Sequence, residues 1–187
     1  PNLAPIQAWL TVNPNEIPHL IENLKSNEDS LRFNSFLLTQ SIAREEGSLL
    51  YPYWQEFVSM LNDSNNFFRS IAIQILAALC PIDQENKFEW IQDDYFSHLH
   101  SGSIMTIRYL IQSFPVIYQA KPNLRSYLLS IMLHIEKHVN LKAERIDLVR
   151  NDILIVFEEI WELIGEKEPL VEFAEKALEY FSSKEYS

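Results

Sequence analysis

Two pairs of histidines give this chain its only sequence pattern with metal-binding chemistry. His134 and His138 are four residues apart, and on one helix this spacing places both imidazoles on the same face, where they could bind a zinc ion. The zinc hydrolase motif needs Glu directly after the first His, but Ile135 stands there. His98 and His100 lie near a turn, and nothing in the sequence brings the two pairs together. We therefore expect no metal and no cofactor.

Carboxylates also cluster, at Asp93-Asp94 and at Glu158, Glu159 and Glu162. General acid–base catalysis needs two carboxyl groups held in different environments across a substrate. Neighbouring carboxylates on one helix form a solvated face instead. The sequence also contains no P-loop, no Gly-rich dinucleotide turn and no nucleophile elbow. We therefore expect no enzyme activity and no catalytic residue.

Four arginines recur at nearly regular positions: Arg32, Arg69, Arg108 and Arg150. The intervals between them are 37, 39 and 42 residues. Each of the first three follows a short polar turn that joins one amphipathic segment to the next. A period near 40 residues with two helices per unit is typical of helical repeat proteins. We expect these arginines to form charge-assisted hydrogen bonds with acidic turn residues, and so to stabilise the fold rather than bind a ligand.

Amphipathic helices are the elements that would position these side chains. Apolar residues recur at helical spacing in the segments 15–26, 31–46, 52–61, 68–79, 88–99, 107–118, 124–139, 143–164 and 169–183. Asp29 or Ser30 is expected to cap the second helix, and Gly47 to end it. Pro115 should kink or end the helix that contains it. Trp9, upstream of these segments, is the tryptophan that we expect to be exposed.

The composition favours a single helical domain over residues 1–187. The hydrophobic fraction is 47%, and there are only three glycines and one cysteine, Cys80, which we expect in the core. No apolar run reaches the length of a membrane span and no leader is visible, so we expect a cytoplasmic protein that does not enter a membrane. The net charge of −11 disfavours nucleic acid as a partner, although residues 101–142 form a basic band.

The repeated segments resemble HEAT repeats, in which two antiparallel helices are joined by a turn that precedes an apolar–Arg pair. The matching pairs are Leu31-Arg32, Phe68-Arg69, Ile107-Arg108 and Val149-Arg150. The resemblance covers about residues 15–165. It implies an all-α fold, a right-handed α-solenoid of about four helix pairs, with the segment from Pro169 as a C-terminal capping helix.

In HEAT proteins the second helices of successive pairs line a concave face. Counting along each second helix from its arginine predicts the following groove-facing residues: Gln40, Ser70, Gln74, Tyr109, Gln112, Asn151 and Glu158. Such polar and aromatic side chains suit contact with a peptide or protein surface. We expect the substitutions Gln74→Glu and Gln112→Glu to leave stability nearly unchanged and to weaken partner binding.

The resemblance thus implies a non-enzymatic scaffold or adaptor that binds a protein or peptide partner on its concave face. The alternative is an enzyme or nucleic-acid-binding protein on the same scaffold, because some DNA glycosylases for alkylated bases and some pigment lyases use HEAT-like repeats. Arg108 and Tyr109, in the basic band, would then face the nucleic acid. The total charge opposes this alternative.

Overall fold

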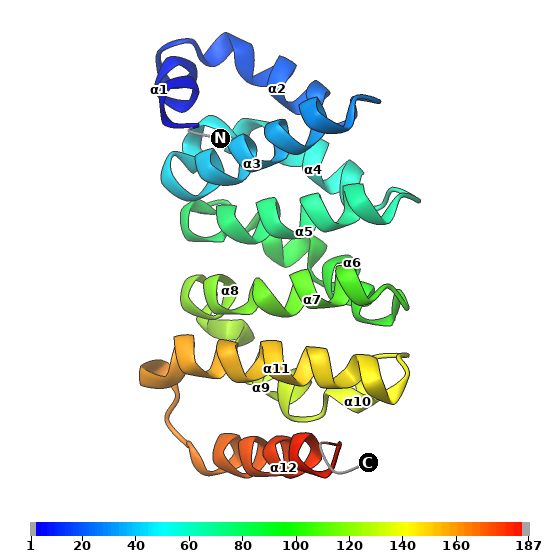
Figure 1. Ribbon diagram of the computed structural model, residues 1–187. Helices are drawn as coiled ribbons and strands as arrows, with labels where there is room; N and C mark the ends of the chain where they lie inside the picture. The colour runs from blue at the N-terminus through cyan, green and yellow to red at the C-terminus, as the bar shows by residue number, and fades with distance from the viewer. Residues whose placement is uncertain (1–2, 185–187) are drawn as a thin grey trace. The chain divides into compact units, whose positions relative to one another are not determined.

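The computed structural model describes residues 3–184 of the chain (Figure 1). The chain clusters into two compact units, one up to Gln92 and the other from Asp93. The described residues form α-helices, short 3₁₀ turns and loops, and no strand occurs among them. The expected all-α class is therefore confirmed, whereas one domain over residues 1–187 stays a prediction. Within the same residues, no helix has both the length and the apolar character needed to cross a membrane.

The first unit consists of short and medium helices joined by 3₁₀ turns. Its helices are α1 (Ala4–Val12), α2 (Ile17–Asn23), α3 (Asp29–Glu45), α4 (Trp54–Leu61) and α5 (Asn66–Leu79). Helix α3 packs against α2 and α5, and α5 also packs against α4. Figure 1 shows α3 and α5 side by side, in two shades of cyan to green. Each of these two helices also packs against the helix that precedes it in the chain, α3 against α2 and α5 against α4.

Apolar stripes at helical spacing build the core of this unit. Phe57 and Leu61 on α4 are fully buried, as are Ile71 and Ile75 on α5. The side chain of Asn65 caps α5 by accepting a hydrogen bond from the amide of Phe67 at 2.9 Å. An N-cap of this kind satisfies one of the free amides at the start of a helix, which fixes where the helix begins.

The second unit follows the same plan with more interruptions. Its helices are α6 (Lys87–Ser97), which begins before the division at Asp93, then α7 (Ile104–Gln112), α8 (Phe114–Ala120), α9 (Arg125–Leu133), α10 (Ile135–His138), α11 (Ala143–Ile160) and α12 (Glu168–Lys184). Helix α11 packs against α7, α8 and α12. Edge-to-face aromatic contacts add to its core, because the ring of Phe96 lies 6.0 Å from that of Phe114 and 5.3 Å from that of Tyr127.

Several predicted boundaries are confirmed. Pro115 does end its helix, since α7 stops at Gln112 and α8 begins one residue before the proline. Pro115 has no amide hydrogen to continue the helical ladder, and Ser113 closes α7 by donating from its hydroxyl to the carbonyl of Tyr109 at 2.8 Å. Cys80 is buried, as expected.

Other local predictions are wrong. The N-cap of α3 is Glu28, and neither Asp29 nor Ser30 occupies that position. Gly47 does not end α3 through a left-handed conformation; it begins a 3₁₀ turn. It is buried, and a Cβ at this position would lie 3.1 Å from the side chains of Leu79 and Ile82. The reason for glycine here is therefore close packing rather than backbone freedom.

The sequence pattern also misplaced three longer elements. The helix expected over 124–139 breaks at His134, where φ is −125°. There is no glycine or proline at this break, so periodicity alone could not reveal it. The helix expected over 143–164 ends at Ile160 and continues as a 3₁₀ turn. Helix α1 was not predicted. Trp9 on this helix is exposed, as expected, although Trp90 is more exposed.

Candidate functional site

In the first unit, the repeated arginines hold the turn that precedes their own helix. Nη1 of Arg32 donates to the carbonyl oxygen of Ser26 at 2.7 Å, and Nη1 of Arg69 donates to that of Asp63 at 2.6 Å. In both cases the carbonyl lies six residues earlier. Nη2 of each arginine also bonds the side chain three residues earlier. Both arginines stand four residues after the N-cap of their helix, so the same turn is built twice.

In the second unit, the arginines stand further along their helices. Arg108 is five residues after its N-cap, Ser103, and Arg150 is eight residues after Lys142. One residue turns an α-helix by about 100°. Arg108 therefore leaves its helix about 100° away from the direction that Arg32 and Arg69 take. Arg150 keeps nearly their direction but lies about one turn further along its helix, and it still bonds the side chain three residues earlier, that of Asp147.

Arg108 reaches across to α11. Its Nε donates to Oδ2 of Asp152 at 2.6 Å and its Nη2 donates to Oδ1 at 3.0 Å, which makes a two-pronged ion pair. Asp152 is only 1% exposed, and it also accepts a bond from Nε2 of Gln112 at 3.0 Å. The hydrogen bonds with Asp152 hold the pKa of Arg108 above its ordinary value. This cluster ties α7 to α11.

Arg150 joins α11 to α10. Its Nε and Nη2 donate to Oε1 of Glu136 at 3.0 and 2.6 Å, and its Nη1 donates to Oδ1 of Asp147 at 2.8 Å. Burial lowers the pKa of Arg150, but the hydrogen bonds to these two carboxylates outweigh that effect and raise it. All four arginines thus take part in structural contacts.

Three of the predicted groove residues lie in the first unit, and the structure brings two of them together. Nε2 of Gln40 on α3 donates to Oε1 of Gln74 on α5 at 2.7 Å, and Nε2 of Gln74 donates to the carbonyl of Ser70 at 3.0 Å. Ser70 itself is 2% exposed, and its hydroxyl donates to the carbonyl of Asn66. Ser70 is therefore not presented to a partner in this structure, because α5 turns that position towards the core.

The other four lie on α7 and α11 of the second unit. Tyr109 is partly exposed and Gln112 is exposed on α7. Asn151 and Glu158 are exposed on α11, and their separation of seven residues puts them on one face of that helix. Figure 1 shows α7 and α11 side by side and running in the same direction. The structure therefore places these four residues on neighbouring helices.

The prediction missed three exposed apolar residues beside them. Met105 on α7 and both Leu148 and Ile155 on α11 are between 41% and 48% exposed. The bonds from Arg108 and Gln112 to Asp152 join α7 to α11, the two helices that carry these residues. The spacing could have revealed Leu148 and Ile155. They are seven residues apart, so they share one face of the helix, and this face differs from the one that carries the buried Val149 and Ile153.

We call this surface the α7–α11 face. It consists of Met105, Tyr109, Gln112, Leu148, Asn151, Ile155 and Glu158. Apolar side chains stand between polar ones, and further exposed carboxylates follow at Glu159 and Glu162. Such a surface can cover aliphatic groups and form hydrogen bonds around them.

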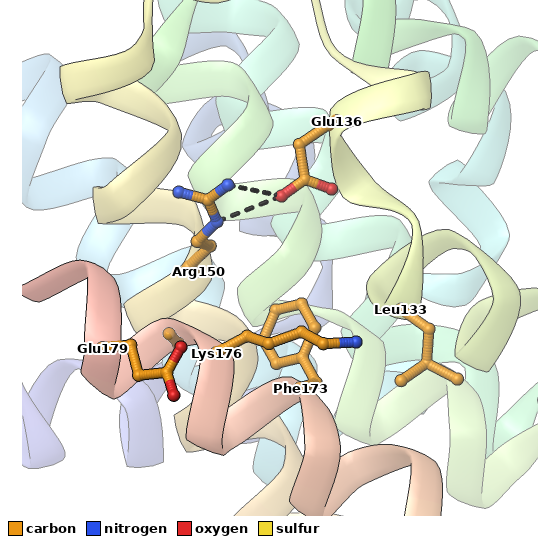
Figure 2. Close-up of a pocket in the computed structure, with 7 residues that line it drawn as sticks. Leu133, Glu136, Arg150, Phe173, Lys176 and Glu179 are labelled. Carbon is orange, nitrogen blue, oxygen red and sulfur yellow. Dashed lines mark hydrogen bonds and ion pairs between the residues drawn. The ribbon is translucent and has the colours of Figure 1, made fainter.

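A cavity of about 530 Å³ lies elsewhere in the second unit, beside α12. Its lining residues are Leu133, Glu136, Arg150, Phe173, Lys176, Ala177 and Glu179. Figure 2 shows the Arg150–Glu136 ion pair on one side and the stem of Lys176 passing in front of the Phe173 ring. A smaller cavity of about 200 Å³ shares Leu133, Phe173 and Lys176. Two cations face two carboxylates around the larger cavity, so its walls favour neither an anionic nor a cationic ligand.

His138 in the second unit is influenced electrostatically by two of the other paired histidines, His100 and His134. Burial is the main cause that lowers the pKa of His138, and the nearby His100, His134 and Lys137 lower it further. The break at His134 means that the two histidines of the i, i+4 pair do not share one continuous helix. Over residues 3–184, no group of three or more His, Cys, Asp or Glu side chains is arranged to hold a metal ion.

Comparison with protein-family models, with curated proteins and with solved structures finds no match to this chain.

Proposed function

We propose that the chain is a HEAT-like repeat protein, a right-handed solenoid of about four helix pairs with α12 as its cap. The repeated turn supports this proposal, because Arg32 and Arg69 bond it in the same way. The N-cap residues of the second helices add to this support. Glu28, Asn65, Ser103 and Lys142 follow one another at intervals of 37, 38 and 39 residues, which is more regular than the spacing of the arginines.

The scaffold, in this proposal, binds a segment of a partner protein and catalyses no reaction. The observation that carries it is the α7–α11 face, where Met105, Leu148 and Ile155 are exposed next to predicted groove residues. Burying a largely exposed aliphatic side chain is favourable by about 1 kcal/mol or more. Three such side chains on packed helices form a preorganised anchor site for a partner.

The charge of this face indicates the chemistry of the partner. Glu158, Glu159 and Glu162 are exposed near the C-terminal end of α11, where the helix dipole is already negative and carboxylates are unfavourable. Positive charge from a partner would relieve this repulsion. We therefore expect a segment with aliphatic or aromatic side chains close to Lys or Arg.

The nucleic-acid alternative finds less support. Arg108, the residue of the basic band that would face the nucleic acid, is held by the buried Asp152. Arg150, on α11, is paired with Glu136 and Asp147. Phosphate binding relies on cations that are free to replace counterions, and these two are already paired.

Site-specific cross-linking tests the proposed function. A photoreactive phenylalanine derivative at Ile155 should cross-link a partner in the lysate of the source cells, and mass spectrometry should place the link in a segment rich in apolar and basic residues. The matched control carries the same group at Leu178 on α12, which is also exposed, and should not capture this partner. Equal capture at both positions, or no capture at Ile155, would contradict the proposal.

A further inference from the structure

Helix α1 buries Gln7 and Leu10 against the rest of the unit and leaves Ile6, Trp9 and Val12 on its outer side. Gln7 is the buried polar residue; its Nε2 donates to Glu45 at 2.8 Å and its Oε1 accepts from Ser41 at 2.8 Å, both on α3. The hydroxyl of Thr11 donates to Glu46 at 2.7 Å. These bonds fix α1 on α3 through polar groups. A surface helix normally buries its apolar stripe, whereas α1 buries one glutamine and one leucine and leaves three large apolar side chains exposed.

The outward side chains of α1 form an apolar patch with neighbours from α3. Ile6 and Trp9 are each 50% exposed and Val12 is 75% exposed. Leu31 on α3, which lines the same groove as Ile6 and Trp9, is also exposed. Residues 1–15 contain no charged side chain, although 22% of the chain is charged. Exposed apolar residues are ordinary when scattered, but a group of them indicates an interaction surface.

A groove of about 270 Å³ lies within this patch. Its lining residues are Leu3, Ile6, Trp9, Leu10, Glu16, His19, Leu20, Asn23, Leu31, Asn34, Ser35 and Leu38. The patch therefore combines a protruding indole, that of Trp9, with an apolar groove at its side. A twofold interface needs such a surface, because every group on one copy must meet its complement on the same surface of the other copy.

We propose that this patch is a self-association surface, and that its occupant is the same patch of a second copy of the chain, with Trp9 of each copy entering the groove of the other. The proposal is independent of the α7–α11 face, which lies in the other unit.

Charge favours a second copy over a different protein. Two chains of net charge −11 repel each other, and the uncharged patch is where they can approach at the lowest electrostatic cost. A different partner of so acidic a protein would gain specificity and speed from charged contacts, and α1 offers none. Only Glu16 among the groove residues carries a full negative charge.

Sedimentation over a wide range of concentrations tests the inference. The full chain should shift from 22.0 kDa to twice that mass as its concentration rises. The variant Trp9→Glu should raise the dissociation constant by about 30-fold or more, because it places a charge at a central aromatic anchor. Val171→Glu on α12 is the matched control, since Val171 is similarly exposed at 45%, and it should dimerise like the unmodified chain.

A second variant distinguishes weakened association from a folding defect. Val12→Lys changes the most exposed residue of the patch, should keep the melting temperature of the monomer, and should also weaken association. A chain that stays at the monomer mass at every concentration would overturn the inference. A dimer that survives both α1 variants, or a patch covered by a different protein while the chain remains monomeric, would overturn it as well.

Discussion

The two units use arginines of similar spacing in different ways. In the first unit, Arg32 and Arg69 bond a backbone carbonyl six residues away and so stabilise a local turn. In the second unit, Arg108 bonds Asp152, which lies 44 residues further along the chain. The local contacts define where a helix begins, whereas the distant contact sets the register of two packed helices.

The difference follows from the position of each arginine relative to its N-cap. An arginine four residues after the N-cap points back to the turn, and one residue more rotates the side chain by about 100° towards the neighbouring helix. Ile107, fully buried, takes the equivalent position in the second unit. The spacing between arginines did not reveal this difference in position relative to the N-cap. An extra residue in the turn and an extra residue in the helix both lengthen the interval between two arginines in the same way.

The largest effect should come from Asp152→Ala. The substitution removes a buried carboxylate that accepts bonds from Arg108 and Gln112, and leaves the arginine without its partner. We expect a loss of about 3 kcal/mol in the free energy of unfolding, at the lower end for a broken buried pair because Arg108 is partly exposed. Urea denaturation measures it. A loss below about 1 kcal/mol would show that the cluster is no stronger than a surface ion pair.

Arg69→Ala should have a smaller effect, and Arg32→Ala should match it. Each variant loses one bond to a turn carbonyl and one to a neighbouring side chain, which corresponds to about 1–2 kcal/mol. Equal losses would support the equivalence of the two turns. Thermal or urea unfolding of the two variants side by side provides the measurement, and losses that differ by more than about 1 kcal/mol would break the equivalence.

Replacing a glutamine by glutamate should also affect stability differently in the two units. Gln112→Glu would place a carboxylate beside the buried Asp152, so we now expect it to destabilise the chain by about 1 kcal/mol. The sequence had suggested no change. Gln74→Glu loses a bond to the carbonyl of Ser70 but can still accept from Gln40, and should cost less. Unfolding curves that rank the two variants in the opposite order would contradict the contacts described for Gln112.

The smallest effect concerns acid sensitivity in the second unit. The pKa of His138 is lowered in the folded state, so between this value and the ordinary pKa of about 6.5 the unfolded chain binds more protons. Stability should therefore fall as the pH drops through this window and then level off. His138→Asn should reduce the fall between about pH 7.5 and about pH 5, measured by urea midpoints. An unchanged pH dependence of stability in this variant would show that His138 does not cause the loss of stability at acid pH.

The sequence predicted the helical class well because apolar periodicity is a local signal. Pro115 could be placed because its effect on the backbone does not depend on context. The break at His134 could not, since no residue type marks it. Periodicity also could not reveal helix α1, because its packing includes bonds from Gln7 and Thr11 to Glu45 and Glu46, more than thirty positions away.

The exposure of the predicted groove residues was correct only in part. Counting from the arginines found Gln40 and Gln74 as neighbours, and it placed Asn151 on the exposed side of α11. It put Ser70 at the surface although α5 buries it. It did not identify Ile155, because an apolar residue in an amphipathic helix was assigned to the core by default.

The most direct test compares stability and binding in two variants. The partner segment recovered by cross-linking at Ile155 would be synthesised with a fluorescent label and titrated against each protein. Leu148→Ser combined with Ile155→Ser should weaken binding about tenfold or more at an unchanged melting temperature, because both side chains are exposed. Arg69→Ala should lower the melting temperature and leave the affinity unchanged. The reverse result, with affinity lost in Arg69→Ala and retained in the double variant, would contradict the account.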